Sequence, residues 1–132
     1  MDETNVKAAV RETYGRIAQA PDSCGCGCDG DEVNTTDMAR SIGYSQDEIE
    51  QTPAGANLGL GCGNPTAIAD LKPGETVVDL GSGAGFDCFL AADSVGENGR
   101  VIGIDMTPEM IDKARGNATR GGYPQVEFRL GE

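Results

Sequence analysis

A glycine-rich segment from Val77 to Asp87, V-V-D-L-G-S-G-A-G-F-D, constrains this chain more than any other part of it. A short apolar run ends at an acid, three glycines follow at alternate positions, and an apolar helical pattern begins at Phe86. This order predicts a strand, a tight turn and the start of a helix. Glycine permits positive φ and lets a ligand approach the backbone, and the first N–H groups of the helix open onto the same crevice. The segment is therefore predicted to hold a small adenine-containing cofactor.

The spacing of the glycines distinguishes two classes of cofactor. The dinucleotide fingerprint is G-x-G-x-x-G with an acid about 20 residues later, whereas this chain has D-x-G-x-G-x-G. A second acid, Asp105, follows the predicted strand Val101 to Ile104, where it can accept hydrogen bonds from both hydroxyls of a ribose. This arrangement resembles the first motif of class I S-adenosylmethionine (SAM) methyltransferases and favours SAM over a dinucleotide such as NAD. The predicted cofactor residues are Asp79, Gly81, Ser82, Gly83, Gly85 and Asp105.

Composition and charge exclude several other functions. The chain has 132 residues, which is enough for one ordinary domain, and its net charge is −12. Such a charge repels phosphate backbones, so nucleic acid is not expected as partner or substrate. No run approaches the ~18 apolar residues of a membrane span, and the acidic start M-D-E-T-N lacks the apolar core of a secretory signal. We expect a cytoplasmic protein with no membrane partner, and the absence of His excludes imidazole catalysis.

Five cysteines in a cytoplasmic chain favour thiol or soft-ion chemistry over a disulfide framework. Cys24, Cys26 and Cys28 alternate with glycine in a predicted loop, a spacing that can turn several sulfurs toward one soft ion. An exposed thiol loop without a ligand is the alternative. Cys62 lies between two glycines just before a predicted helix, which favours a reactive thiolate, although a small buried turn residue fits the same pattern. Cys88 is expected in the core, on the helix that follows the glycine turn.

The first part of the chain is predicted to be helical. A helix is expected from Thr4 to Ala20, with Thr4 as its cap and with Val6, Val10, Tyr14 and Ile17 on its apolar face. The segment Ser45-Gln46-Asp47-Glu48 is a capping box, so a short helix is expected over residues 46–51. We assign residues 1–63 to a helical and cysteine-rich extension, and residues 64–132 to the first half of a cofactor-binding domain.

The second part of the chain predicts an α/β fold. Its expected strands are Thr76 to Leu80, Arg100 to Ile104 and Gln125 to Leu130, with helices between them. Right-handed crossovers give a parallel, Rossmann-like sheet of order 3-2-1, which we expect to be cut short after its third strand. The first strand would lie at an open edge, although its apolar residues predict burial on both faces. Such an edge predicts a homo-oligomer in which two copies pair strand to strand.

Three segments together resemble one methyltransferase family. They read A-N-L-G-L-G-C-G-N-P at 56–65, D-L-G-S-G-A-G-F-D-C at 79–88 and V-I-G-I-D-M-T-P-E-M at 101–110, and they look like the matching segments of arsenite SAM methyltransferases. The resemblance implies that the glycine loop holds the methionine part of SAM and that Asp105 holds the ribose. It further implies that Met106 lies beside the adenine.

The same resemblance extends to Tyr14 and to the cysteines. It implies that Tyr14 covers the cofactor and that Cys62 is an arsenic-handling or redox-active thiol, partnered by Cys24, Cys26 or Cys28. The implied substrate is arsenite or its thiol conjugates, with a thiol reductant as partner. Two further arsenic-binding cysteines of that family would fall beyond Glu132, so we expect the chain to be inactive alone. A SAM methyltransferase with a carbon or oxygen acceptor, such as a quinone, and a non-enzymatic soft-metal-binding module remain as alternatives.

Overall fold

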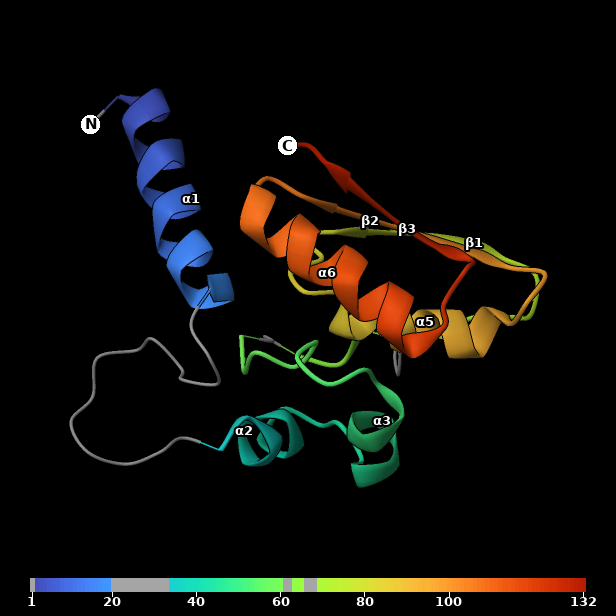
Figure 1. Cartoon of the computed structure of the whole chain (residues 1–132). Coiled ribbons are helices and arrows are strands. Elements are labelled where there is room, and N and C mark those ends of the chain that lie inside the picture. Colours follow the sequence, from blue (N-terminus) through green and yellow to red (C-terminus); the bar gives the residue numbers. More distant parts are fainter. Residues whose placement is uncertain (1, 20–33, 61–62, 66–68) are drawn as a thin grey trace.

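The computed structural model describes residues 2–19, 34–60, 63–65 and 69–132. Helices α5 and α6 lie against one face of a sheet, α1 stands beside α6, and α2 and α3 lie on the side of α5 away from the sheet (Figure 1). None of the described helices has the length and hydropathy needed to cross a bilayer. In chain order the elements are α1 (Glu3–Gln19), α2 (Thr35–Ser41), α3 (Gln46–Gln51), β1 (Thr76–Leu80), α5 (Phe86–Val95), β2 (Arg100–Asp105), α6 (Pro108–Gly121) and β3 (Val126–Leu130).

The sheet confirms the predicted α/β architecture. Its strands are parallel in the order β1-β2-β3, with Val77 opposite Val101 and Val101 opposite Val126. The strand bounds agree with prediction to within one residue. The differences are that β2 extends to Asp105 and that β3 begins at Val126. The carboxyl ends of all three strands therefore meet at one edge, where ligands bind in open α/β sheets.

The core fills the space between the sheet and the two helices that cover it. Phe89 is fully buried, and its ring centroid lies 5.8 Å from that of Phe128 and 4.8 Å from that of Tyr123. Cys88 has 0% exposure beside them, so its predicted place in the core is confirmed. The other fully buried members of this cluster come from α5, β2 and α6, and they include Ala92, Val101 and Ala114.

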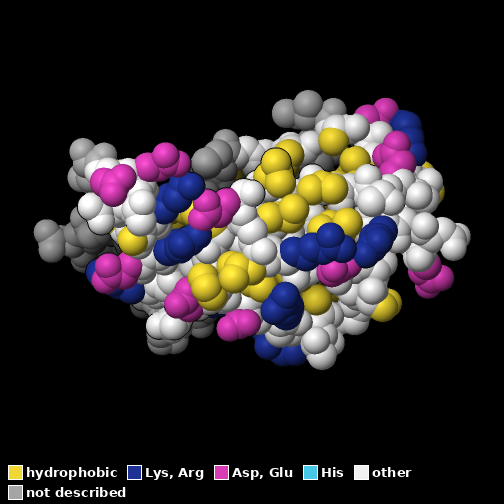
Figure 2. Space-filling model, turned by 90° about the horizontal axis from the view of Figure 1, so that it is seen from above, with side chains coloured by type: hydrophobic (Ala, Val, Ile, Leu, Met, Phe, Trp, Pro, Cys, Tyr) yellow, Lys and Arg dark blue, Asp and Glu magenta, His cyan; other side chains and the backbone are white. Residues whose placement is uncertain are grey.

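Strand β1 does not lie buried on both faces, and that prediction is wrong. Val78 is 54% exposed and Leu80 is 76% exposed, while their neighbours Val77 and Asp79 are partly buried. Helices α5 and α6 cover only the face toward Val77 and Asp79, and no described helix covers the other. Figure 2 shows hydrophobic side chains gathered on the surface seen from above, with arginine and lysine side chains around them.

Helix α1 buries two small residues more fully than the residues of its predicted apolar face. Val6 and Tyr14 are each 42% exposed, whereas Gly15 and Ala18 are buried. A Cβ on Gly15 would lie 3.0 Å from Oε2 of Glu109 on α6, so the two helices approach closely along this glycine. The predicted face is confirmed only in part, because Val10 and Ile17 are partly buried while Val6 and Tyr14 are exposed.

The predicted N-terminal cap is confirmed at α3 but not at α1. At α3 the predicted capping box is confirmed, since the Ser45 side chain accepts from the Glu48 N–H and the Glu48 side chain accepts from the Ser45 N–H. Helix α2 is capped by Asn34, which we had not predicted. Helix α1 begins at Glu3, so Thr4 lies inside the helix and is not its cap.

Candidate cofactor-binding site

The predicted glycine turn joins β1 to α5 and has the expected backbone. Gly81, Gly83 and Gly85 have φ angles of 76°, 54° and 97°, a region that favours glycine. A Cβ added to Gly81 or Gly83 would meet no atom within 4 Å, whereas one added to Gly85 would lie 2.6 Å from Cζ of Phe128. The first two glycines therefore face open space, and the third lets the loop close onto the core.

The end of β2 holds this glycine loop in place. The Ile104 carbonyl accepts hydrogen bonds from the N–H groups of Gly81 and Ser82, at 2.7 and 3.0 Å. The Gly83 N–H donates to Oδ2 of Asp105 at 2.9 Å. The loop therefore takes its shape from the neighbouring strand, and the two predicted parts of the cofactor site, loop and acid, are in direct contact.

Asp105 is the predicted ribose ligand, and each of its oxygens accepts a backbone N–H. Besides Gly83 on Oδ2, the N–H of Thr107 donates to Oδ1 at 2.9 Å. An ionised carboxylate offers about four acceptor positions, so Asp105 retains capacity for hydroxyl groups of a ligand. Met106 follows at the same edge of the sheet and is partly buried.

Asp79 lies on β1 directly below the loop and is paired with a thiol. Sγ of Cys88 donates to Oδ2 of Asp79 at 3.3 Å. Burial raises the pKa of Asp79, and Asp105 raises it further. Burial also raises the pKa of the Cys88 thiol, as does the nearby Asp79. Cys88 therefore stays protonated, which makes it a structural thiol and not a nucleophile.

Tyr44 connects the helical extension to this site, and sequence reasoning missed it. Its hydroxyl lies 2.5 Å from Oδ1 of Asp87 and 2.6 Å from the Gly63 carbonyl, and the residue is 4% exposed. Burial raises the pKa of Tyr44 and also that of Asp87. A hydroxyl has one proton and can donate to only one acceptor at a time, so the Tyr44 proton is shared between the Asp87 carboxyl and the Gly63 carbonyl.

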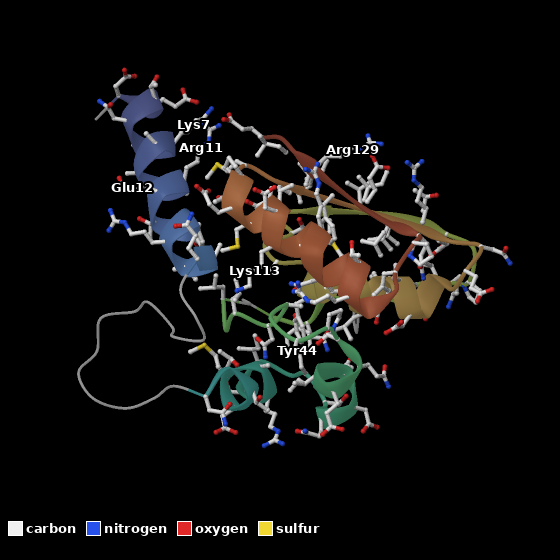
Figure 3. All side chains as sticks on the ribbon, in the orientation of Figure 1. Lys7, Arg11, Glu12, Tyr44, Lys113 and Arg129 are labelled. Atoms are coloured by element: carbon white, nitrogen blue, oxygen red, sulfur yellow. The ribbon has the colours of Figure 1, made fainter. Side chains whose placement is uncertain are left out.

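A signal for Tyr44 was present in the sequence. It immediately precedes the capping residue Ser45, and Ile49 is the fourth residue of the helix that follows, the two positions that form a hydrophobic staple. In the structure Ile49 packs against the cluster that contains Tyr44, and the Tyr44 ring lies 4.7 Å from that of Phe86, centroid to centroid. Figure 3 shows Tyr44 between the α2–α3 region and the α/β unit.

A cavity of about 100 Å³ lies between the glycine loop and the 56–60 segment. Phe86 and Asp87 line it together with the loop. Pockets that enclose a whole small molecule measure roughly 300–1,000 Å³, so this cavity matches only part of a cofactor. Oγ of Ser82, also at this wall, is buried without a hydrogen-bond partner among the described residues. Together with the open positions at Gly81 and Gly83, this unsatisfied hydroxyl fits a polar ligand in the cradle.

Other predicted site residues lie elsewhere or outside the described residues. Tyr14 is on α1 and is not among the described residues that line the cavity. No group of three or more metal-binding side chains occurs within the described part of the chain. The predicted thiol site falls outside it, because the structure does not describe Cys24, Cys26, Cys28 or Cys62.

Comparison with known proteins identifies the class to which this fold and site belong. A family model described as a methyltransferase domain matches residues 71–132, the part that contains the glycine loop and Asp105. The structure resembles that of a SAM-dependent methyltransferase from Aquifex aeolicus, with a TM-score of 0.50, 26% identity, and coverage of 75% of this chain and 47% of that one. Over these residues the chain is similar to SAM-dependent methyltransferases.

Within that class, the sequence is similar to an arsenite methyltransferase from Halobacterium salinarum. The two are 52% identical over 141 residues, which cover 99% of this chain and 36% of the relative. A protein-L-isoaspartate O-methyltransferase from Methanococcoides burtonii is 42% identical over 59 residues, which cover 45% of this chain and 29% of that protein. The resemblance inferred from the three motifs is confirmed, and the chain spans about a third of the length of these relatives.

Proposed function

We propose that this chain is the cofactor-binding part of a methyltransferase that moves the methyl group of SAM to trivalent arsenic. The observation that carries the proposal is the similarity to an arsenite methyltransferase over 99% of the chain. That span takes in the cysteine-containing segments as well as the glycine loop. The similarity to the O-methyltransferase, by contrast, covers 45% of the chain.

The residues of the glycine loop fit SAM as the cofactor. In this proposal Asp79, Gly81, Ser82, Gly83 and Gly85 hold its methionine part, with the unsatisfied Ser82 hydroxyl as one new hydrogen-bond donor. Asp105 binds the ribose, Met106 packs beside the adenine, and Tyr14 of α1 closes over the site. When bound, SAM supplies a methyl group on a sulfonium, which a lone pair can accept without proton transfer.

The cysteines supply the acceptor side of the reaction. Trivalent arsenic is thiophilic, so thiolates are its natural ligands, and we assign this role to Cys62 with Cys24, Cys26 or Cys28. Methylation oxidises arsenic(III) formally to arsenic(V), and two thiols can return the two electrons by forming a disulfide. A thiol reductant then restores the dithiol. The cytosol keeps such thiols reduced, and we propose it as the compartment.

A calorimetric titration of the full chain with SAM, S-adenosylhomocysteine (SAH) and NAD tests the cofactor assignment. We expect SAM and SAH to bind, weakly because the described cavity is small, and NAD to bind less well. Asp105→Ala should weaken SAH binding by about tenfold, the effect of losing hydrogen bonds to a charged group. Asp112→Ala, which removes an exposed acid of α6, is the matched control. Tighter binding of NAD than of SAM would contradict the assignment.

Arsenite binding tests the acceptor separately. We expect arsenite to bind the reduced chain in native mass spectrometry, and Cys62→Ser to weaken this binding while Cys88→Ser leaves it unchanged. Binding of SAM without arsenite would favour the carbon- or oxygen-acceptor alternative. Binding of arsenite without SAM would favour the non-enzymatic soft-metal module.

A further inference from the structure

Asn117 is a fully buried polar residue on the apolar face of α6. It follows Met110, Ile111 and Ala114 at helical spacing, and like Ala114 it has 0% exposure. Buried amides are retained where they have hydrogen-bond partners. A polar side chain in this position therefore indicates a specific bond that the helix supplies to something packed against it.

The two partners of Asn117 require an amide at this position. Nδ2 of Asn117 donates to the Ala84 carbonyl at 3.1 Å, and Oδ1 accepts from the Arg120 guanidinium. A carbonyl can only accept and a guanidinium can only donate. An asparagine satisfies both neighbours at once, whereas an aspartate would present an acceptor to the Ala84 carbonyl.

The bond to Ala84 gives the glycine loop a second attachment point. Ala84 lies between Gly83, whose N–H is held by Asp105 from β2, and Gly85, whose positive φ turns the chain into α5. Two consecutive residues of the loop are therefore held by different elements, Gly83 by the end of β2 and Ala84 by α6.

Asn117 also contacts the segment that leads into the opposite wall of the cavity. A Cβ on Gly55 would lie 3.4 Å from Oδ1 of Asn117 and 3.5 Å from Cε of Lys113. Ala56, the next residue, is 3% exposed and lines the cavity. Lys113 in turn donates to the Ala18 carbonyl of α1 at 3.3 Å, and Figure 3 shows it on the side of α6 toward α1. Asn117 thus binds one wall of the cavity at Ala84 and lies near Gly55, the residue that precedes the other wall at Ala56.

We propose that Asn117 is a positioning residue for cofactor binding. By holding the Ala84 carbonyl it fixes the shape of the glycine loop, and with it the affinity for SAM, without lining the cavity itself. The effect on affinity rests on the proposed cofactor site. The effect on the loop does not, because the bond is made without a ligand.

Asn117→Asp is the sharpest test, because it keeps the shape of the side chain and the contact with Arg120. It replaces the N–H donor that faces the Ala84 carbonyl by an acceptor, so that hydrogen bond is lost. We expect about tenfold weaker SAH binding by calorimetry, as for a buried acceptor left unpaired. We also expect faster hydrogen exchange at the N–H groups of Gly83 and Gly85 in the ligand-free chain, with exchange in β2 unchanged.

Two control variants separate positioning from stability, each measured well below its melting temperature. Arg120→Ala removes the other partner of Asn117 and should leave SAH affinity and loop exchange unchanged. Val95→Ala truncates a buried residue at the far end of α5 and should lower stability alone. If Val95→Ala affects SAH binding and loop exchange as Asn117→Asp does, the inference is overturned. If the wild-type chain binds no SAH, the proposed function fails, and the exchange rates alone decide the role of Asn117.

Discussion

Replacing Gly103 by alanine is expected to destabilise the protein, because the centre of the sheet has no room for a methyl group. A Cβ at Gly103 would lie 2.6 Å from Cδ1 of Phe128 and 2.9 Å from Cβ of Ser82, both closer than the 3.0 Å that real Cβ atoms keep. Neither neighbour is the free end of a flexible side chain. The clash must therefore be relieved by moving the Phe128 ring or the glycine loop.

The Phe128 ring cannot easily retreat. It is 3% exposed, its centroid lies 5.8 Å from that of the fully buried Phe89, and a Cβ on Gly85 would lie 2.6 Å from its Cζ. The ring thus fills the space that two glycines leave open. Overpacking of such a core costs about 1–3 kcal/mol. For a domain of this size, that corresponds to a melting temperature lower by roughly 3–15 °C.

Thermal melts followed by circular dichroism measure this effect, with a second glycine-to-alanine change as the control. At Gly116 on α6 a Cβ would meet only the flexible end of Arg120, at 3.2 Å, so Gly116→Ala should stabilise the helix by up to about 1 kcal/mol. Adding Phe128→Leu to Gly103→Ala should recover part of the loss, since the smaller side chain frees space. A Gly103→Ala protein that melts at or above the wild-type temperature would refute this account of the core.

Three further predictions concern charge, thiols and assembly. Asp87→Asn should raise the melting temperature at neutral pH but not near pH 4. Burial raises the pKa of Asp87, so the stability that its protonated form contributes is complete below its pKa in the unfolded chain and is lost as the pH rises through its pKa in the folded protein. An equal gain at both pH values would contradict this. Cys88, at 0% exposure, should be alkylated more slowly than Cys62 in the native protein, as mass spectrometry can measure, and earlier labelling of Cys88 would show that the thiol assignments are wrong. The exposed apolar side of β1 should support a homodimer whose fraction rises with salt, because each copy carries a net charge of −12; a monomer at high salt by light scattering would rule it out.

The sheet and the glycine loop could be predicted because their signals are local. Strands β1 and β2 are short, mainly apolar runs and β3 alternates apolar with charged residues, each bounded by turn residues. The alternating glycines between β1 and α5 have a positive φ that glycine adopts without strain. The order of the strands then follows from right-handed crossovers. For these reasons the sequence predicts that the glycine loop and Asp105 lie at the same edge of the sheet, where the Gly83 N–H donates to Asp105.

The missed features depend on contacts between distant segments. The exposed positions of Val6 and Tyr14 follow from the approach of α1 to α6 at Gly15, a contact that no periodicity within α1 encodes. Tyr44 and Asn117 are polar groups that bind backbone carbonyls many residues away. A staple position and a polar residue on an apolar helix face are local hints of such bonds, but they do not name the partner.

Acidic groups at the carboxyl end of the sheet lead to a last prediction about the cofactor. Burial raises the pKa of Asp79, and Asp105 adds to the rise; burial raises that of Asp87, with Asp79 and Glu48 adding to it. Each of these acids is therefore costly to ionise in the folded protein, and a nearby cation lowers that cost. The sulfonium of SAM is such a cation, whereas SAH has a neutral sulfur in its place. The ratio of SAM affinity to SAH affinity should therefore rise with pH as Asp79 and Asp87 ionise, when it is measured over mildly acidic pH values at which the α-ammonium groups of both molecules stay protonated. Calorimetry at several pH values measures this ratio, and Asp87→Asn should flatten its rise. A ratio that stays constant with pH would show that these acids do not sense the charge of the cofactor.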